Sequence, residues 1–285
     1  MIGGALKRWE RSAKRTALGL LPHGLEGRLR ARHARRQIES FAPRIAEHDY
    51  GQWRLKVYLD DVLAADWYDK DWPELPEIAT LRQTRLRAGA KVFDLGAHQG
   101  VVAMMLAREV GPSGCVLALE PNPHNFAVAV KNRDLNAMSQ LEILQTAVSS
   151  QSGTVTFNQE LNGQLDDGTG AGGRLEVASV SVDGLADRFG MPDVVFIDVE
   201  GAECLALAGA SRTLAAGADF FIEVHIGWGL EKLGGSLEKI LSYFPERRFT
   251  ILARTKAQDH FYPLMENTPR EHFFLIAQAR EVSTG

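Results

Sequence analysis

The chain has 285 residues and a formal net charge of -4, with 45% hydrophobic and 24% charged residues. These values are typical of a globular protein and exclude fibrous and intrinsically disordered classes. The charge is unevenly spread, because residues 1–40 carry +7 (ten Lys/Arg against three acids) and the remaining 245 residues carry -11. Composition therefore confines any binding of a polyanion such as nucleic acid to the first forty residues.

The chain has two cysteines, Cys115 and Cys204, which are far apart in the sequence. This excludes a CxxC redox pair, a thiolate zinc site and a disulfide framework, and it indicates a reducing compartment. No run approaches the ~18 apolar residues that span a membrane, and the basic N-terminus lacks the apolar core of a signal peptide. We expect a cytoplasmic protein in which residues 1–73 form a basic helical extension or cap and residues 74–285 form one domain.

From residue 91 onward, short apolar runs alternate with helical patterns. Strands are predicted over residues 91–94, 115–119, 141–148, 194–199, 220–225, 248–253 and 273–277. Helices are predicted over residues 101–110, 123–136, 202–216 and 236–243. This alternation predicts an α/β fold with a doubly wound sheet. Five glycines within residues 163–173 predict a loop, either a lid over a site or a surface insertion.

A glycine-containing turn follows the first predicted strand. Gly96 and Gly100 sit where the strand meets a helix, Asp94 ends the strand, and Glu120 ends the next strand, where an acid can accept both hydroxyls of a ribose. His98 stands where a dinucleotide-binding turn needs glycine to approach a pyrophosphate. The pattern therefore disfavours NAD and FAD. It favours a nucleoside without phosphates that carries a cationic group, which describes S-adenosylmethionine.

Ionisable residues follow the fourth and fifth predicted strands. Asp198 and Glu200 come after one, and Glu223 and His225 end the other. Because the carboxyl ends of parallel strands share one edge of a sheet, we expect these four side chains to converge. Such a cluster suits removal of a proton from a substrate hydroxyl, or binding of a divalent cation. Glu203 fits the first turn of the following helix, where the helix dipole favours an acid.

Five segments together resemble the FkbM-type S-adenosylmethionine-dependent methyltransferases of the class I superfamily. They are Val-Phe-Asp-Leu-Gly-Ala-His-Gln-Gly (92–100), Leu-Glu-Pro-Asn-Pro (119–123), Ser-Val-Asp-Gly-Leu (181–185), Ile-Asp-Val-Glu-Gly-Ala-Glu (197–203) and Ile-Glu-Val-His (222–225). The resemblance implies a Rossmann-like sheet of seven strands in the order 3-2-1-4-5-7-6, with an antiparallel seventh strand. It also implies O-methylation of a hydroxyl on a sugar, glycan or natural product. His98 departs from the family, in which Asn is common.

By position, the resemblance also implies roles for individual residues. Cofactor contacts would come from Asp94, Gly96, Ala97, His98, Gly100, Glu120, Pro121, Asn122, Ala147 and Asp198. The cofactor would leave as S-adenosylhomocysteine. We expect His225 to act as the catalytic base, oriented by Glu223. Asp198 and Glu200 would bind the acceptor hydroxyl or a divalent metal.

Other functions stay open at this point. One is N-methylation of peptide side-chain amides, and another is a non-catalytic S-adenosylmethionine-binding module. A nucleic-acid methyltransferase is disfavoured, since acids occupy the position where a Pro-Pro-aromatic turn would stack on a flipped base. The basic arm suits a solvated helical cap, a homodimer contact, or docking to an acidic membrane surface or a partner. Trp228, which follows the fifth strand, suits stacking on a sugar ring.

Overall fold

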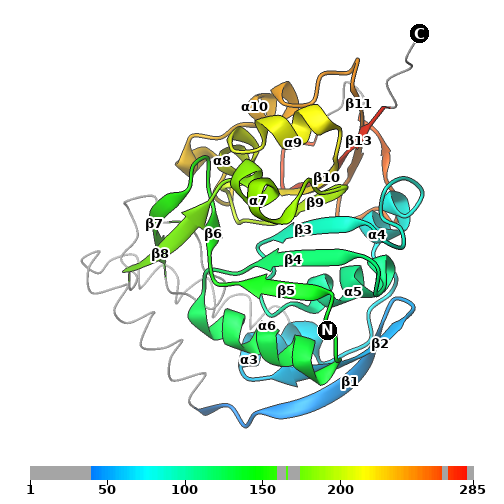
Figure 1. Ribbon diagram of the computed structural model, residues 1–285, viewed down its shortest axis with the longest axis vertical. Helices are drawn as coiled ribbons and strands as arrows, with labels where there is room; N and C mark the ends of the chain where they lie inside the picture. The colour runs from blue at the N-terminus through cyan, green and yellow to red at the C-terminus, as the bar shows by residue number, and fades with distance from the viewer. Residues whose placement is uncertain (1–39, 159–164, 166–173, 265–268, 281–285) are drawn as a thin grey trace, which may run out of the picture.

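The computed structural model describes residues 40–158, 165, 174–264 and 269–280 (Figure 1). The expected basic helix within residues 1–39 lies outside the described residues, and so does most of the glycine-rich loop of residues 163–173. Among the described residues, no helix is both long and apolar enough to span a membrane.

A central sheet of eight strands organises the chain. Its strands are β3 (Lys91–Leu95), β4 (Cys115–Leu119), β5 (Leu141–Leu144), β9 (Val194–Ile197), β10 (Asp219–Val224), β11 (Phe249–Arg254), β12 (Tyr262–Pro263) and β13 (Phe273–Ala279). They lie side by side in the order β12-β11-β13-β10-β9-β3-β4-β5. β3, β4, β5, β9 and β10 are parallel, whereas β13 is antiparallel to both β10 and β11. When β12 is left out and the other seven strands are numbered 1 to 7 along the chain, their order read from the β5 edge is 3-2-1-4-5-7-6.

Helices cover both faces of this sheet (Figure 1). One face packs against α3 (Val62–Tyr68), α4 (Pro76–Leu81), α5 (Val101–Val110) and α6 (Pro123–Leu135). The other packs against α7 (Val182–Phe189), α8 (Glu203–Ala208), α9 (Ser211–Ala216) and α10 (Leu237–Ser242). Strand alternation divides the side chains between the two cores, so that Val92 joins the first and Phe93 and Leu95 join the second.

Two predicted elements are divided in the structure. The helix expected over 202–216 consists of α8 and α9, because the Gly209 carbonyl accepts the amide of Asp183 from α7. The strand expected over 141–148 ends at Leu144, where Thr146 N–H turns back to the Leu144 carbonyl. Thr146 Oγ1 then donates to the Ala178 carbonyl. Residues 147–148 (β6, Ala147–Val148) thereby join a side sheet with β7 (Gly153–Asn158) and β8 (Arg174–Val180).

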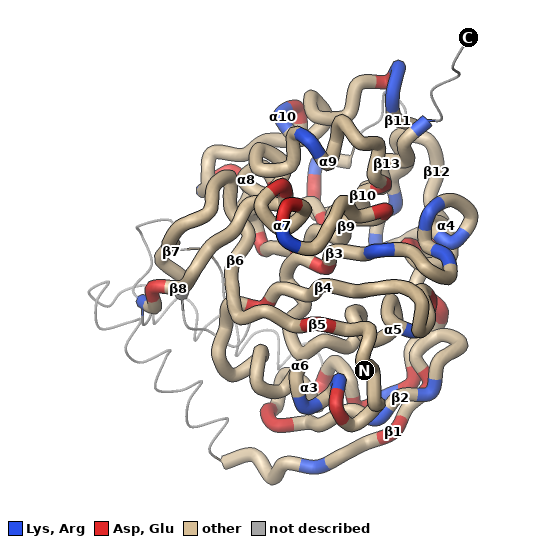
Figure 2. Tube along the Cα trace, in the orientation of Figure 1, with Lys and Arg blue, Asp and Glu red and all other residues tan. Residues whose placement is uncertain are grey.

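The prediction of a helical extension is wrong for residues 44–59, which form the antiparallel hairpin β1 (Arg44–Tyr50) and β2 (Trp53–Leu59). The physical reason is a period of two: Leu55, Val57 and Leu59 are buried while the residues between them are more exposed. Basic and acidic residues both occur along the hairpin (Figure 2), and Arg54 pairs with Glu47 and Asp49 across its two strands.

The hairpin is fixed to the domain by polar and apolar contacts. Asn132 Oδ1 of α6 accepts the amide of Tyr58 at 2.6 Å, and Asn136 Oδ1 accepts the amide of Lys56 at 3.0 Å. The buried side chains of β2 belong to the same hydrophobic core as α5. This packing places α3, which follows the hairpin, against the carboxyl-end edge of the sheet, where Tyr68 joins a cavity wall.

Candidate functional site

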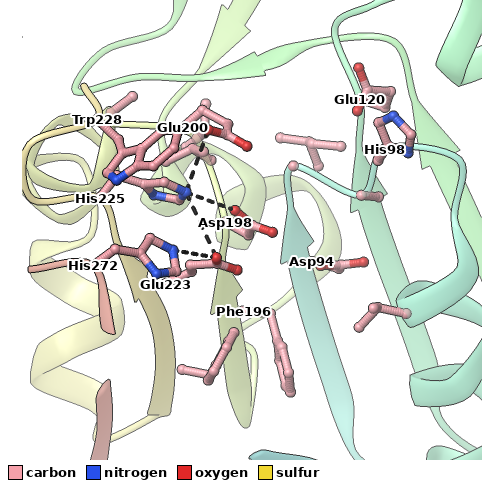
Figure 3. A pocket seen from close by; sticks show the side chains of 18 of the residues that line it. Asp94, His98, Glu120, Phe196, Asp198, Glu200, Glu223, His225, Trp228 and His272 are labelled. Atoms are coloured by element: carbon pink, nitrogen blue, oxygen red, sulfur yellow. Dashed lines mark hydrogen bonds and ion pairs between the residues drawn. The ribbon is translucent and has the colours of Figure 1, made fainter. Parts of the chain in front are cut away.

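A cavity of about 1390 Å³ lies at the carboxyl ends of the central strands, on the face covered by α3 to α6. Strand register aligns Asp94 of β3 with Phe196 of β9, and Phe196 with Phe221 of β10. The rings of Phe196 and Phe221 lie 5.0 Å apart and form an apolar part of its wall. The cavity thus brings polar groups from several strand ends together over an apolar base (Figure 3).

Asp94 and Glu120 occupy one side of the cavity and are both buried. Burial raises the pKa of Asp94 to about 7. Burial also raises the pKa of Glu120 to about 8, against the opposing effect of hydrogen bonds from the backbone N–H groups of Asn122 and His98. Asp94 Oδ2 is buried and has no hydrogen-bond partner among the described residues. Two buried acids without a fixed cation fit a ligand that brings hydroxyls and a positive charge, as S-adenosylmethionine does.

Most of the other predicted cofactor residues also line this cavity, namely Gly96, Ala97, His98, Pro121, Ala147 and Asp198. Gly100 and Asn122 do not. Gly100 is the N-cap residue of α5 and packs on Ala129 of α6. Asn122 caps α6 by accepting the amides of His124 and Asn125. The structure therefore assigns these two residues to helix starts beside the cavity rather than to its wall.

Gly96 brings the turn after β3 against the end of β9. Its φ is +96°, and a Cβ atom there would lie 1.8 Å from the carbonyl oxygen of Asp198. Any side chain would push these two segments apart. Gly96 thus fixes the distance between the Asp94 side of the cavity and Asp198.

His225 stands at the centre of the ionisable cluster on the other side of the cavity (Figure 3). Its Nε2 lies 3.5 Å from Glu200 Oε2, 3.7 Å from Asp198 Oδ1 and 4.0 Å from Glu223 Oε1. The side chain of His225 is only 5% exposed, whereas that of Asp198 is 44% exposed. The four predicted residues therefore converge, and His225 approaches the cavity with its Nε2 atom.

Glu203, and not Glu223, orients His225. Its Oε1 lies 2.6 Å from His225 Nδ1 and also accepts the amide of Gly201 at 2.9 Å. Glu203 is fully buried in the first turn of α8. The prediction that Glu223 orients the imidazole is wrong, because Glu223 pairs with His272 at 2.5 Å.

His272 places a second imidazole in the cluster. It immediately precedes β13, and the register that pairs Val224 with Phe273 brings His272 beside His225, with ring centroids 5.1 Å apart. The hydrogen bond from His272 and the charge of His225 outweigh burial and lower the pKa of Glu223. His272 and His225 therefore keep Glu223 in its ionised form.

The cluster shifts the protonation of its central members. Burial alone would lower the pKa of His225, but the hydrogen bond and charge of Glu203, with the charges of Asp198 and Glu200, raise it to about 9. Enclosure in the cavity raises the pKa of Asp198 well above its usual value, and the charge of Glu223 adds to this effect. In neutral solution the free protein therefore holds an imidazolium at His225.

A divalent cation at this cluster stays a prediction. Two sets of donors, Glu223–His225–His272 and Asp198–Glu200–His225, have ligand atoms within 4.8 Å of one another. Carboxylate oxygen and imidazole nitrogen are donor types that Mn²⁺, Fe²⁺ and Zn²⁺ accept.

The loops after β9 and β10 are tightly joined beside the cluster. Glu200 has a left-handed φ of +51°, a strained conformation for a residue with a side chain. At Gly201, where φ is +108°, a Cβ would lie 2.5 Å from the carbonyl carbon of Gly229. Trp228, in the same loop as Gly229, lines the cavity with a 63% exposed side chain.

Three residues that shape the site, Glu203, His272 and Tyr68, were not predicted in these positions. Glu203 was assigned to the helix dipole, and no local pattern distinguishes that role from a contact with His225. The position of His272 follows from topology. Because β13 is antiparallel to β10, the residue just before β13 lies beside the carboxyl end of β10. Tyr68 of α3 lines the cavity from a segment predicted to be an extension.

Comparison with known proteins gives the family. The sequence profile of the methyltransferase FkbM domain matches residues 94–251, which is more than half of the chain. A hexuronic acid methyltransferase, AglP, of Haloferax volcanii is 29% identical over 141 residues. That match covers 48% of this chain and 56% of the relative, so the chain spans little more than half the length of the curated protein it matches.

Solved structures show more distant likenesses. A methyltransferase FkbM from Methylobacillus flagellatus is 19% identical, with a TM-score of 0.44 over 66% of this chain and 43% of that one. A putative rRNA methylase from Clostridium thermocellum is 14% identical, with a TM-score of 0.45 over 71% and 93%. Neither likeness bears on the chemistry of the site. On the profile match, the chain belongs to the FkbM methyltransferase family.

Proposed function

We propose that this FkbM methyltransferase transfers a methyl group from S-adenosylmethionine to a hydroxyl of a sugar or glycan. The observation that carries the proposal is the position of His225, whose Nε2 faces Asp198 and Glu200 in the cavity that also holds Asp94 and Glu120. The relative from Haloferax volcanii, named a hexuronic acid methyltransferase, supports a sugar acceptor.

Asp94 and Glu120 would hold the cofactor. Glu120 ends β4, where a carboxylate accepts hydrogen bonds from ribose hydroxyls. Asp94 Oδ2 offers a buried acceptor for a positively charged group. The bound cofactor supplies a methyl group already activated on a sulfonium. What remains for the protein is to place the acceptor and remove its proton.

The acceptor hydroxyl would lie between Asp198, Glu200 and His225. The two carboxylates accept hydrogen bonds from a sugar, and His225 takes the hydroxyl proton at Nε2. Glu203, fixed on Nδ1, stabilises the imidazolium that this transfer produces. The exposed indole of Trp228 gives the sugar ring an apolar surface on which to stack.

The first test is the variant His225→Ala, assayed with radiolabelled S-adenosylmethionine and a panel of neutral and acidic sugars. We expect turnover to fall by about 10²–10⁴-fold, the usual contribution of a general base, while the dissociation constant of the cofactor is kept. His260→Ala is the matched control, because His260 is an exposed histidine that contacts Asp259.

Two outcomes would contradict the proposal. Equal turnover in His225→Ala and the wild type would remove His225 as the base. Methylation of a peptide amide with no transfer to any sugar would remove the sugar acceptor, while leaving the cofactor assignment in place.

A further inference from the structure

Tyr68 enters the cofactor side of the cavity from outside the FkbM profile. It is the last residue of α3, whereas the profile match begins at residue 94. Tyr68 is 6% exposed and lines the cavity together with Trp67 and His98. Its hydroxyl lies 2.8 Å from His98 Nδ1. A segment that precedes the family domain therefore supplies part of the wall of its principal cavity.

The position of α3 is fixed by several contacts. Asp61 Oδ1 accepts the amides of Leu63 and Ala64 at the start of the helix, both at 2.8 Å. The other oxygen, Asp61 Oδ2, accepts Gln99 Nε2 at 2.7 Å and lies 3.0 Å from His124 Nε2. These bonds join α3 to the turn after β3 and to the start of α6.

Contacts at the other end of α3 also fix Tyr68. The Tyr50 hydroxyl of the hairpin donates to the Tyr68 carbonyl. The rings of Tyr68 and Trp72 lie 5.7 Å apart. Tyr68 is thus held by its backbone and its ring, independently of the bond that its hydroxyl makes to His98.

His98 has an unusual backbone that its neighbours support. Its φ is +49°, in the left-handed region that residues with side chains other than Asn, Asp and His rarely adopt. The Trp67 ring lies 5.2 Å and the Tyr68 ring 5.8 Å from the imidazole. Strained backbone of this kind persists where the surroundings over-determine it, and it gathers at binding sites.

The surroundings of the Tyr68 hydroxyl favour its protonated form. Burial raises the pKa of Tyr68 well above its usual value, and the charges of Asp198 and Glu120 raise it further. The phenol therefore keeps its proton and is able to donate it in a hydrogen bond to His98 Nδ1. Tyr68 lines the same cavity as Glu120 and Asp198, the two groups between which the cofactor would extend.

We propose that Tyr68 and His98 form one positioning unit for the part of S-adenosylmethionine that lies between Glu120 and Asp198, with the Tyr68 hydroxyl holding the imidazole in place. The inference rests on the use of S-adenosylmethionine under the proposed function. It makes the segment before the FkbM domain a component of the cofactor site.

A double-mutant cycle tests this unit. The variants are Tyr68→Phe, His98→Asn and their combination, and calorimetry gives their dissociation constants for S-adenosylmethionine and S-adenosylhomocysteine. Asn tolerates a left-handed φ but lacks the imidazole. We expect each single variant to bind S-adenosylmethionine about tenfold more weakly, as the loss of one buried hydrogen bond implies. The double variant should also bind about tenfold more weakly, because both changes break the same contact.

Controls separate positioning from folding. Tyr58→Phe removes a hydroxyl that contacts Asp60 outside the cavity wall, and it should bind the cofactor like the wild type. The melting temperatures of all the variants should stay close to that of the wild type, since a merely structural pair would lower them together with the affinity.

Wild-type affinity in Tyr68→Phe, or single losses that multiply to about a hundredfold in the double variant, would overturn the inference. Failure of the wild type to bind S-adenosylmethionine would instead overturn the proposed function.

Discussion

The buried carboxylate of Glu203 lies 2.6 Å from Nδ1 of His225 and so determines that Nε2 is the nitrogen presented to the cavity. The two residues are 22 positions apart in the chain, and their contact joins the first turn of α8 to the end of β10. A histidine held in this way by a buried acid is a more precise base than one that rotates, because its lone pair has one direction.

The first prediction concerns Glu203→Gln. We expect kcat to fall by on the order of 10²–10⁴-fold with KM nearly unchanged, since the amide supports neither the tautomer nor the charge of His225. Glu246→Gln, on an exposed surface, is the control and should leave kcat intact. Glu223→Gln provides a second comparison. A larger loss of kcat in Glu223→Gln than in Glu203→Gln would contradict the orientation seen here.

The second prediction concerns pH. Because the pKa of His225 is raised to about 9, the base form is scarce in neutral solution and grows as the pH rises. With cofactor and acceptor saturating, kcat should therefore rise between pH 7 and pH 9, by up to about tenfold per unit where a single deprotonation controls the rate. In Glu203→Gln the rise in kcat should occur at lower pH, because an amide replaces the carboxylate whose hydrogen bond and charge raise the pKa of His225.

Dialysis against EDTA distinguishes a role of His225 as a base from a role as a metal ligand. A cation on Nε2 would leave no lone pair for the acceptor proton. Loss of activity after dialysis, restored by Mn²⁺ or Mg²⁺ and not by a change of pH, would therefore contradict His225 as the base. The same result would establish the divalent cation that the donor set permits.

The third prediction concerns cofactor binding. Asp94 and Glu120, with pKa values of about 7 and 8, are largely protonated in the free protein at pH 6, whereas a cationic ligand favours their ionised forms. The dissociation constant of S-adenosylmethionine should fall by roughly tenfold or more from pH 6 to pH 8 and then level off. Protons should be released on binding.

Calorimetry in buffers of different ionisation enthalpy measures that proton release. Glu120→Gln should weaken binding and leave a single transition near pH 7, from Asp94. A dissociation constant that does not change between pH 6 and pH 9 would show that neither acid changes its ionisation when the cofactor binds.

The fourth prediction concerns Gly96→Ala. The added Cβ would meet the Asp198 carbonyl at 1.8 Å in addition to the strain of a left-handed φ. We expect the free energy of unfolding to fall by more than about 3 kcal/mol. Gly111→Ala isolates the strain, because Gly111 has a φ of +64° and nothing within 4 Å of an added Cβ. It should cost only about 1–3 kcal/mol. Equal losses in urea titrations of the two variants would mean that the close approach has no energetic weight.

The sequence predicted the central strands well because each is a short apolar run buried on both faces, a pattern that needs no knowledge of its neighbours. β4 (Cys115–Leu119) and α5 (Val101–Val110) have the predicted bounds. Residues 147–148 read equally well as a continuation of β5, and only their pairing with β8 separates them from it. The hairpin was missed because its residues were grouped with the basic residues 1–40 in one predicted helical extension, and the alternation of its buried residues was not used.

At the site, the sequence identified groups that follow strand ends and could not identify their partners. Asp94, Glu120, Asp198, Glu200, Glu223 and His225 all line the cavity, as the shared edge of a parallel sheet requires. Glu203 and Glu223 show this limit, because the sequence predicted that Glu223 orients His225, whereas Glu203 does so in the structure. Two acids near one histidine in the sequence are equivalent until the rotation of α8 and the position of His272 are known.

The contact between Gly201 and Gly229 has a consequence for the acceptor side of the cavity. A Cβ atom at Gly201 would lie 2.5 Å from the carbonyl carbon of Gly229, so the distance between the loops after β9 and β10 depends on glycine at this position. Glu200 and Trp228 stand next to these two glycines, and both line the cavity. Gly201 thus determines how far apart the carboxylate and the indole lie, and with that the size of the acceptor that fits between them.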